Sequence, residues 1–278
     1  MDIKGLGICE WALPTPLRGP YLCRVLKDFG LDAVELELGT VEENFPLANP
    51  YIIDRYKEEQ VKYGTTYTGI AVNLTDFYDM TAPLGDPGRE MVEYALRTAV
   101  DSANALGAAL IHVPSLHGLK SEVETEEDLK NTSECIQRIC DYAQGKNVLV
   151  CTENDFTTEM QLEMNRLVDR DNFGIYFDTQ NPHALNGLNA PDLIEPIFDR
   201  IPEFHIKDGF DQISTHTIGE GDCNPFASLE VFNRLGYKGW IILENYFWRT
   251  PMCGIGDDPY KLLQKDIDIV RKWLAEHK

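Results

Sequence analysis

The sequence is short of basic residues. Its 278 residues include 25 Lys and Arg against 46 Asp and Glu, which gives a formal net charge of −21. A surface this negative repels nucleic-acid phosphates and anionic lipid headgroups, so we expect neither a nucleic-acid nor a membrane partner. The acidic excess otherwise favours solubility alone. It removes candidate partners without indicating what the protein binds.

Three further features are missing. No apolar run reaches the roughly 18 residues that a membrane-spanning helix needs, and the start MDIKGLGICEWALP lacks the basic and apolar regions of a secretory signal. The seven cysteines include no C-x-x-C pair, and the two nearest are Cys135 and Cys140. That spacing argues against a zinc–thiolate site and against a disulfide framework. We therefore predict a cytoplasmic protein with reduced thiols.

No Gly-, Pro- or Ser-rich linker divides the chain, so we predict one domain over residues 1–278. Short apolar segments rich in β-branched residues recur along it instead. They are apolar on both faces, as the strands of a covered parallel sheet are. These predicted strands are IKGLGIC, DAVELEL, YTGIAVN, ALIHVP, NVLVCTE, GIYFD, EFHIKD and WIILE.

Helical segments separate the predicted strands. Asp86 and Thr125 are plausible amino-terminal caps, and Gly107 is placed to end a helix. Eight strand–helix units of about 33 residues predict a (β/α)8 TIM barrel. The alternative, a doubly wound open α/β sheet, lacks its G-x-G-x-x-G after the first strand. The predicted helices cover residues 17–29, 50–63, 88–106, 126–144, 157–169, 191–199, 226–235 and 258–275.

Four consecutive strands in the second half end on Glu153, Asp178, His205 and Glu244. The carboxyl ends of barrel strands share one face, so these side chains are expected to converge. Taken singly, each carboxylate is explained as a helix cap or as a charge at the barrel rim, and the histidine is explained as a core residue. Together, three buried carboxylates would repel one another unless a cation binds among them. Oxygen ligands with one histidine suit Mn²⁺, Mg²⁺ or Co²⁺ and do not exclude Zn²⁺.

The segments that carry these residues resemble the sugar-phosphate isomerase/epimerase family, which has a xylose isomerase-like barrel. The resemblance rests on the Glu that ends VLVCTE, on YFDTQN, FHIKD and GEGD, and on the Glu of GWIILEN. It extends over essentially the whole chain and is most specific between residues 148 and 246. It implies a TIM barrel that acts on a small carbohydrate.

In that family four strand-end residues hold one divalent ion, commonly Mn²⁺ or Co²⁺. The resemblance assigns this role to Glu153, Asp178, His205 and Glu244, and it assigns proton exchange with the substrate to Glu153 and Glu244. An ion that stabilises an enediolate, with one carboxylate to remove a proton and another to return it, is sound chemistry for such a reaction. We therefore predict an isomerase or epimerase with Mn²⁺ as its ion, while Co²⁺, Mg²⁺ and Zn²⁺ fit the same ligands.

The resemblance also implies substrate contacts after Asp178. Many epimerases of the family place a substrate-contacting histidine three positions after this aspartate, where the present chain has Asn181, and His183 follows two positions later. Either side chain is a candidate for the substrate hydroxyls, and a plain loop role is the alternative. An arginine often found six positions after the metal histidine is replaced by Asp211, so the ketose 3-epimerase substrate site does not transfer directly.

Three more residues are candidates for substrate contact. Lys207 lies two positions after His205 on a strand and faces the same side, where it would contact a substrate oxygen or balance the acidic ligands. Trp11 closes the first strand and would form an apolar wall for a sugar ring, and His112 lies on the fourth strand. A core or lid role is the alternative for Trp11.

Several functions share these features. A lyase that dehydrates an inosose-like ketone would use the same metal ligands, and an auxiliary subunit of a sugar-processing complex would keep the barrel. An endonuclease IV-type nuclease needs more histidines than the six present. Basic residues are few in the late loops, which favours a substrate without phosphate. Barrels of this group commonly dimerise, so a homo-oligomer is expected.

Overall fold

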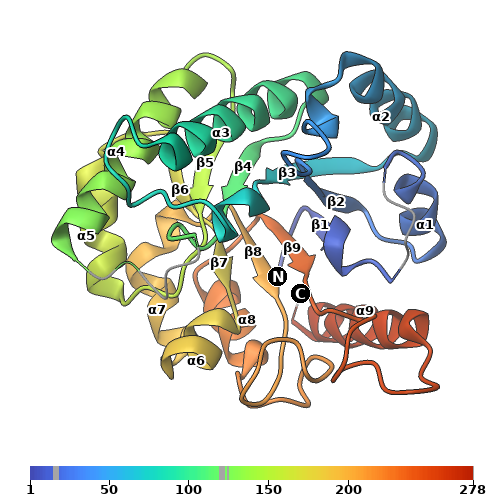
Figure 1. Ribbon diagram of the computed structural model, residues 1–278. Helices are drawn as coiled ribbons and strands as arrows, with labels where there is room; N and C mark the ends of the chain where they lie inside the picture. The colour runs from blue at the N-terminus through green and yellow to red at the C-terminus, as the bar shows by residue number, and fades with distance from the viewer. Residues whose placement is uncertain (15–18, 119–122, 124, 278) are drawn as a thin grey trace. The chain divides into compact units, whose positions relative to one another are not determined.

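Strands and helices alternate along the computed structural model, which describes residues 1–14, 19–118, 123 and 125–277 (Figure 1). The strands within these residues are β1 (Gly5–Cys9), β2 (Ala33–Glu37), β3 (Thr66–Ala71), β4 (Leu110–Val113), β5 (Leu149–Thr152), β6 (Phe173–Ile175), β7 (Phe177–Asp178), β8 (Glu203–Ile206) and β9 (Trp240–Leu243). The α-helices are α1 (Leu22–Asp28), α2 (Pro50–Tyr63), α3 (Pro87–Leu106), α4 (Glu126–Ala143), α5 (Thr158–Val168), α6 (Asn181–Asn186), α7 (Ala190–Ile197), α8 (Pro225–Arg234) and α9 (Pro259–Glu276). Short 3-10 turns cover Glu10–Ala12, Pro46–Ala48, Asn73–Asp76 and Phe198–Arg200.

The chain forms two compact units. The first unit comprises Met1–Val34, Asp155–Thr158 and Phe177–Lys278. The second unit comprises Glu35–Asn154 and Glu159–Tyr176. The prediction of one domain over residues 1–278 stays a prediction.

In the second unit the strands β3, β4, β5 and β6 run parallel, each beside its neighbour in sequence. Helix α3 packs on β3 and β4, and α4 packs on β5 (Figure 1). All four residues of β4 are buried, as expected for a strand covered on both faces. Leu110, Cys151 and Tyr176 form part of the core between these strands.

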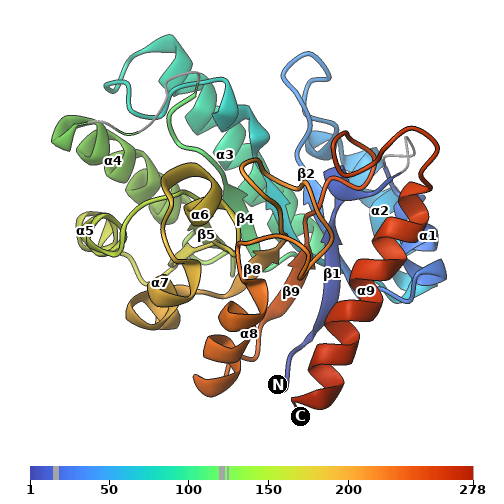
Figure 2. The ribbon, with the colours of Figure 1, turned by 90° about the horizontal axis from the view of Figure 1, so that it is seen from below.

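In the first unit the first strand pairs with the last. Strand β1 runs parallel to β9, β9 to β8, and β8 to β7. A barrel requires the pairing of β1 with β9, whereas a doubly wound open sheet would leave its last strand at an edge. Met1 and His277 lie side by side, and the Met1 amino group donates to the His277 carbonyl (Figures 1 and 2).

Local sequence signals account for the helix ends. The Asp86 carboxylate accepts hydrogen bonds from the backbone N–H groups of Gly88 and Arg89 at the start of α3. Gly107 ends that helix in the left-handed region, at φ 73°. Thr125 and Asp128 form a reciprocal capping box at the start of α4. The predicted caps Asp86 and Thr125 are therefore confirmed.

Three elements differ from the prediction. The predicted strand GIYFD is divided at Tyr176, because β6 pairs with β5 whereas β7 pairs with β8. Helix α6 occupies a segment predicted as loop, and α1 begins at Leu22, while residues 17–18 of the predicted helix lie outside the described residues. Among the described helices, none is long and apolar enough to cross a bilayer.

Candidate active site

Three of the four predicted metal ligands converge in the first unit. Asp178 ends β7, His205 lies on β8 directly opposite it in the sheet, and Glu244 follows β9. All three are buried, and one ligand atom from each lies within 4.8 Å of those of the other two. The parallel strands thus bring the carboxyl ends of β7, β8 and β9 to one place, as predicted.

The ammonium of Lys207 lies between the two carboxylates. Its Nζ is 3.2 Å from Asp178 Oδ2 and also donates to Glu244 Oε2. Lys207 is only 2% exposed, so these ion pairs are shielded from water. Of the two roles that the sequence left open for Lys207, charge balance is therefore the one seen in this structure.

Glu244 and His205 are held by contacts from the first strand. His205 Nδ1 lies 3.1 Å from Glu244 Oε2, and its Nε2 lies 3.2 Å from Cys9 Sγ. The indole N–H of Trp11 donates to Glu244 Oε1 at 2.9 Å, and the Trp11 ring stands edge-on to the imidazole at 6.0 Å. Trp11 thus orients the Glu244 carboxylate, and its predicted role as a wall for a sugar ring stays a prediction.

Asp178 is fixed by the start of α6. Its Oδ1 accepts the backbone N–H groups of Gln180 and Asn181, at 2.7 and 2.6 Å. These bonds leave Oδ2 directed at Lys207. Asn181 therefore contributes its backbone here, and His183 pairs with Asp222 at 3.3 Å. The substrate contacts predicted for Asn181 and His183 stay predictions.

The GEGD loop is anchored on one buried carboxylate. Asp208 accepts hydrogen bonds from the N–H groups of Gly209, Gly219, Gly221 and Cys223, at 2.8 to 3.3 Å. A side chain at Gly221 would lie only 2.3 Å from Asp208 Oδ1, so glycine is required there. This arrangement places the loop immediately after the strand that carries His205.

Asp266 of α9 stabilises the same loop through two hydrogen bonds. Its two oxygens accept from the Ile218 N–H at 2.8 Å and from the Asn245 amide at 2.7 Å. Asn245 in turn accepts the Asp208 N–H at 3.2 Å. Burial raises the pKa of Asp266 to about 7, although both hydrogen bonds and Lys265 oppose that rise.

The fourth predicted ligand, Glu153, lies in the second unit after β5. Its Oε2 is 3.0 Å from His112 Nε2, and His112 Nδ1 is 2.9 Å from Oε1 of Glu35. Burial alone would lower the pKa of His112, but the charge of Glu35 and the hydrogen bond to Glu153 outweigh it and raise the pKa to about 9. The predicted substrate contact of His112 stays a prediction, since carboxylates face both ring nitrogens.

The donor set of the first unit fits a divalent ion. Asp178, His205 and Glu244 offer two carboxylates and an imidazole, a combination that suits Mn²⁺, Co²⁺ or Zn²⁺. Their carboxylates already converge on a cation, the Lys207 ammonium. This convergence is the structural observation that supports a cation site at the ends of β7, β8 and β9.

Sequence reasoning overlooked Cys9 and Glu35. Glu35 carried a visible signal, because it is a carboxylate in the middle of the apolar strand AVELE. Cys9 carried none, since a buried cysteine is common in cores and only the fold shows that its thiol lies beside His205.

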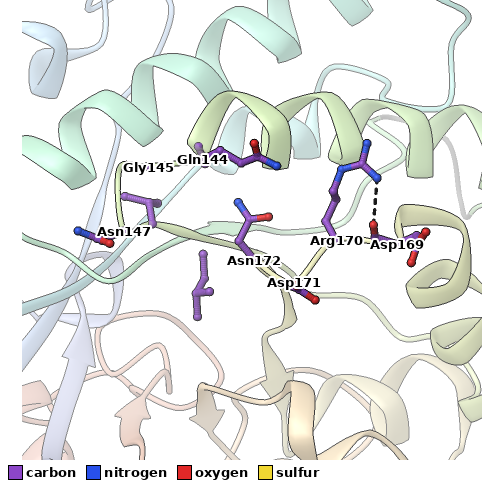
Figure 3. Close-up of a pocket in the computed structure, with 10 residues that line it drawn as sticks. Gln144, Gly145, Asn147, Asp169, Arg170, Asp171 and Asn172 are labelled. Atoms are coloured by element: carbon purple, nitrogen blue, oxygen red, sulfur yellow. Dashed lines mark hydrogen bonds between the residues drawn. The ribbon is translucent and has the colours of Figure 1, made fainter.

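A separate cavity of about 600 Å³ opens at the other end of the second unit's strands (Figure 3). Gln144, Asn147 and Val148 line it before β5, and Arg170 and Asn172 line it before β6. Arg170 is engaged by the Asp141 carboxylate and by the Asp169 carbonyl. Barrel enzymes carry their chemistry at the carboxyl ends of the strands, so this cavity is not part of the candidate site.

Comparison with known proteins identifies relatives of this fold. The chain is 25% identical over 209 residues to an uncharacterized protein of Methanocaldococcus jannaschii, which covers 70% of this chain and 69% of that protein. A structure of D-psicose 3-epimerase from Clostridium cellulolyticum with D-tagatose is similar, with a TM-score of 0.79 and 17% identity. The match covers 97% of this chain and 99% of that chain. The structure of 3-keto-D-glucoside 4-epimerase from E. coli is also similar, with a TM-score of 0.76 and 16% identity. That match covers 98% of this chain and 100% of that chain.

The family model for the xylose isomerase-like TIM barrel matches residues 23–273, which is most of the chain. The predicted (β/α)8 fold is thereby confirmed, in agreement with the pairing of β1 with β9. The chain belongs to the xylose isomerase-like TIM barrel family.

Proposed function

We propose that this protein is a divalent-metal-dependent epimerase or isomerase of a small carbohydrate or keto-sugar. The observation that carries the proposal is the convergence of Asp178, His205 and Glu244 at the carboxyl ends of adjacent strands. Structures with the same fold include D-psicose 3-epimerase and 3-keto-D-glucoside 4-epimerase. The convergence of the side chains and the similarity of the backbone fold are independent observations that support the proposal.

Glu153 is proposed as the fourth ligand. It follows β5, and in a TIM barrel the carboxyl ends of all strands face the same side. Mn²⁺ is the ion that we propose, with Co²⁺, Mg²⁺ and Zn²⁺ as alternatives that the same donors accept. When bound, the ion would supply Lewis acidity toward a carbonyl and its neighbouring hydroxyl.

Glu244 and Glu153 are proposed to carry out the two halves of the proton transfer. Glu244 is oriented by the Trp11 N–H and pairs with Lys207, and we propose that it accepts the proton from the substrate carbon. Glu153 would act on the opposite face of the substrate carbon and return a proton. Return to the same carbon inverts it, and return to the neighbouring carbon interconverts aldose and ketose.

Lys207 also bears on the substrate. If Asp178 and Glu244 hold a metal ion, the Lys207 ammonium loses these two carboxylate partners, and a substrate oxygen is then its natural partner. We therefore propose Lys207, together with His183 and Asn181, as substrate contacts. None of the seven cysteines, all of which lie within the described residues, forms a disulfide, which supports the proposal of a cytoplasmic enzyme.

The test is a screen of ketoses, aldoses and keto-inositols with Mn²⁺ in D₂O, followed by NMR. We expect deuterium to appear at one carbon beside a carbonyl in the wild-type reaction. Glu153→Gln and Glu244→Gln should each abolish this exchange, because each removes a group that moves the proton.

Glu203→Gln is the matched control, since it changes a buried carboxylate at the opposite end of β8. Exchange at the wild-type rate in both active-site variants would reject the proposal. An unsaturated product in place of an isomer would instead assign the same site to a dehydratase. Protein that binds no divalent metal by elemental analysis would favour an auxiliary subunit.

A further inference from the structure

Three buried side chains of the second unit form a line that ends at Glu153. Glu35 lies in the middle of β2 and is 0% exposed, and His112 on β4 is 1% exposed. The imidazole has Glu35 Oε1 at 2.9 Å from Nδ1 and Glu153 Oε2 at 3.0 Å from Nε2. A single ring therefore connects a carboxylate deep in the strand layer to the carboxylate at the strand end.

Tyr176 holds this line from the side. Its hydroxyl donates to Glu35 Oε2 at 3.2 Å, and its ring stacks on the His112 ring with centroids 4.3 Å apart and planes 26° apart. Tyr176 itself is fixed in the core against Leu110 and Cys151. The carboxylates at its two nitrogens thus restrain the imidazole within the ring plane, and the stacked Tyr176 ring restrains its tilt.

A carboxylate at position 35 is costly if it serves the fold alone. Burial of a charge away from water is unfavourable, and apolar residues of similar volume often give equal or better stability. Its neighbours Val34 and Leu36 are apolar and fully buried, as an ordinary core strand requires. A role beyond packing explains why a charged residue occupies this position.

We propose that Glu35, His112 and Tyr176 form a positioning relay that fixes the carboxylate of Glu153. Glu35 and Tyr176 set the orientation of the imidazole, and the imidazole binds one oxygen of Glu153 and so sets the direction of the other. Glu35 thereby influences proton transfer without contacting the substrate. This inference rests on the proposed function, because that function makes Glu153 a proton-transferring group.

The first test compares kinetic constants. Glu35→Gln should lower kcat by roughly 10–100-fold, the usual cost of losing an outer-shell partner, with little change in KM. Tyr176→Phe should give a smaller loss in kcat, since it removes only the hydroxyl bond to Glu35. Both changes preserve size and shape.

Matched controls separate positioning from stability. Glu93→Gln changes a buried carboxylate that pairs with Arg89, Arg97 and Arg138 in the same unit. Tyr67→Phe removes a buried hydroxyl that donates to the Tyr56 carbonyl at 2.7 Å. Both controls should lose stability and keep kcat. A fall in kcat of equal size in the controls would overturn the relay.

The second test needs neither metal nor substrate. The chain has six histidines, so the imidazole N–H signals in ¹⁵N-resolved NMR spectra are few, and the signal missing in His112→Gln identifies the His112 ring. In the metal-free protein we expect a slowly exchanging ring N–H that shifts in Glu153→Gln and also in Glu35→Gln. The same signal should stay in place in Glu93→Gln.

The two tests fail independently. A His112 ring signal that does not respond to Glu35→Gln would overturn the relay whatever the enzyme does. A wild-type protein that turns over no carbohydrate, with the ring signals coupled as expected, would overturn the proposed function and leave the relay's geometry supported.

Discussion

Lys207 gives the candidate site a cation of its own. Its ammonium contacts both Asp178 and Glu244 inside the first unit, where water does not screen the charges. Removing one partner of such a buried cluster leaves an uncompensated charge. The stability of the metal-free protein should therefore depend on this one side chain.

Lys207→Met should destabilise the metal-free protein by about 3–5 kcal/mol, because two buried carboxylates lose their shared cation. Added Mn²⁺ should restore much of this loss, since the ion replaces the missing positive charge. The measurement is urea unfolding in EDTA and in MnCl₂. Lys146→Met, which removes a half-exposed lysine paired with Asp101, should cost less than about 1 kcal/mol and serves as control. Equal midpoints for Lys207→Met and wild type in EDTA would contradict the prediction.

The site was predictable from sequence where a polar residue interrupts an apolar pattern. Asp178, His205 and Glu244 each close a buried strand, and their convergence follows from parallel strands ending on one face. The contacts of Trp11 with Glu244 and of Cys9 with His205 were not predictable, because they join residues more than 190 positions apart. Such contacts depend on the register of β1 against β9, which short-range patterns do not contain.

At the scale of elements, the loop from His216 to Cys223 takes its shape from a single side chain. Asp208 satisfies four backbone N–H groups, three of them in this loop. Asn at this position would offer one acceptor oxygen and an N–H₂ group that faces other donors.

Asp208→Asn should therefore loosen the loop. Loss of a hydrogen bond to a charged group costs about 1.5–3 kcal/mol, so the Gly219 and Gly221 amides should exchange with solvent at least about tenfold faster. Hydrogen–deuterium exchange with mass spectrometry measures this rate. Asp211→Asn changes an exposed aspartate of the same segment and should leave exchange unchanged. Equal protection in Asp208→Asn would refute the role given to this carboxylate.

Asp266 should make stability depend on pH. Burial holds its folded-state pKa at about 7, above the roughly 3.9 of an unfolded chain. The folded protein then binds this proton more tightly, so the contribution of Asp266 is most favourable near pH 4 and declines as pH rises to about 7.

Asp266→Asn should abolish this decline. The free energy of unfolding of wild type minus that of the variant, measured by urea titration, should fall between pH 4 and pH 7 and be constant above pH 8. Comparing the two proteins cancels the titration of other acidic groups. A difference that stays constant over the whole range would show that Asp266 has an ordinary pKa.

Elements with local end signals were predicted well, and those without were not. Helix α3 lies between the Asp86 cap and Gly107, which are both visible in the sequence. Helix α6 was missed because the backbone N–H groups at its start donate to Asp178, a residue interpreted only as a ligand. The division of a strand at Tyr176 reflects a change of sheet partner, which no local pattern records.

At the scale of the whole molecule, part of the net charge of −21 comes from acidic residues that are buried in the fold. Glu93 is buried and binds three arginines, and Asp208, Asp266 and Glu35 are buried as well. The exposed acidic residues repel one another across the surface of the folded chain.

Salt should therefore stabilise the metal-free protein. The screening length falls from about 30 Å at 0.01 M to about 10 Å at 0.1 M salt, which weakens repulsion between distant acids. Tm in EDTA should rise between 10 and 200 mM NaCl, by about 2–4 °C for each kcal/mol of repulsion relieved. Choline chloride at equal ionic strength should act alike. A fall in Tm would show that local ion pairs such as Arg170–Asp141 outweigh the net charge.

The pairing of β1 with β9 also sets the order in which the protein can be completed during synthesis. The second unit is built almost entirely from Glu35–Asn154, so its strands can associate while later residues are still being added. The first unit needs β1 and the strands β7 to β9, which are the most widely separated in the chain, and such long-range pairings form slowly. The newly made β1 lacks one of its two neighbouring strands until β9 has been made. Asp178, His205 and Glu244 can therefore converge only after β9 has been made.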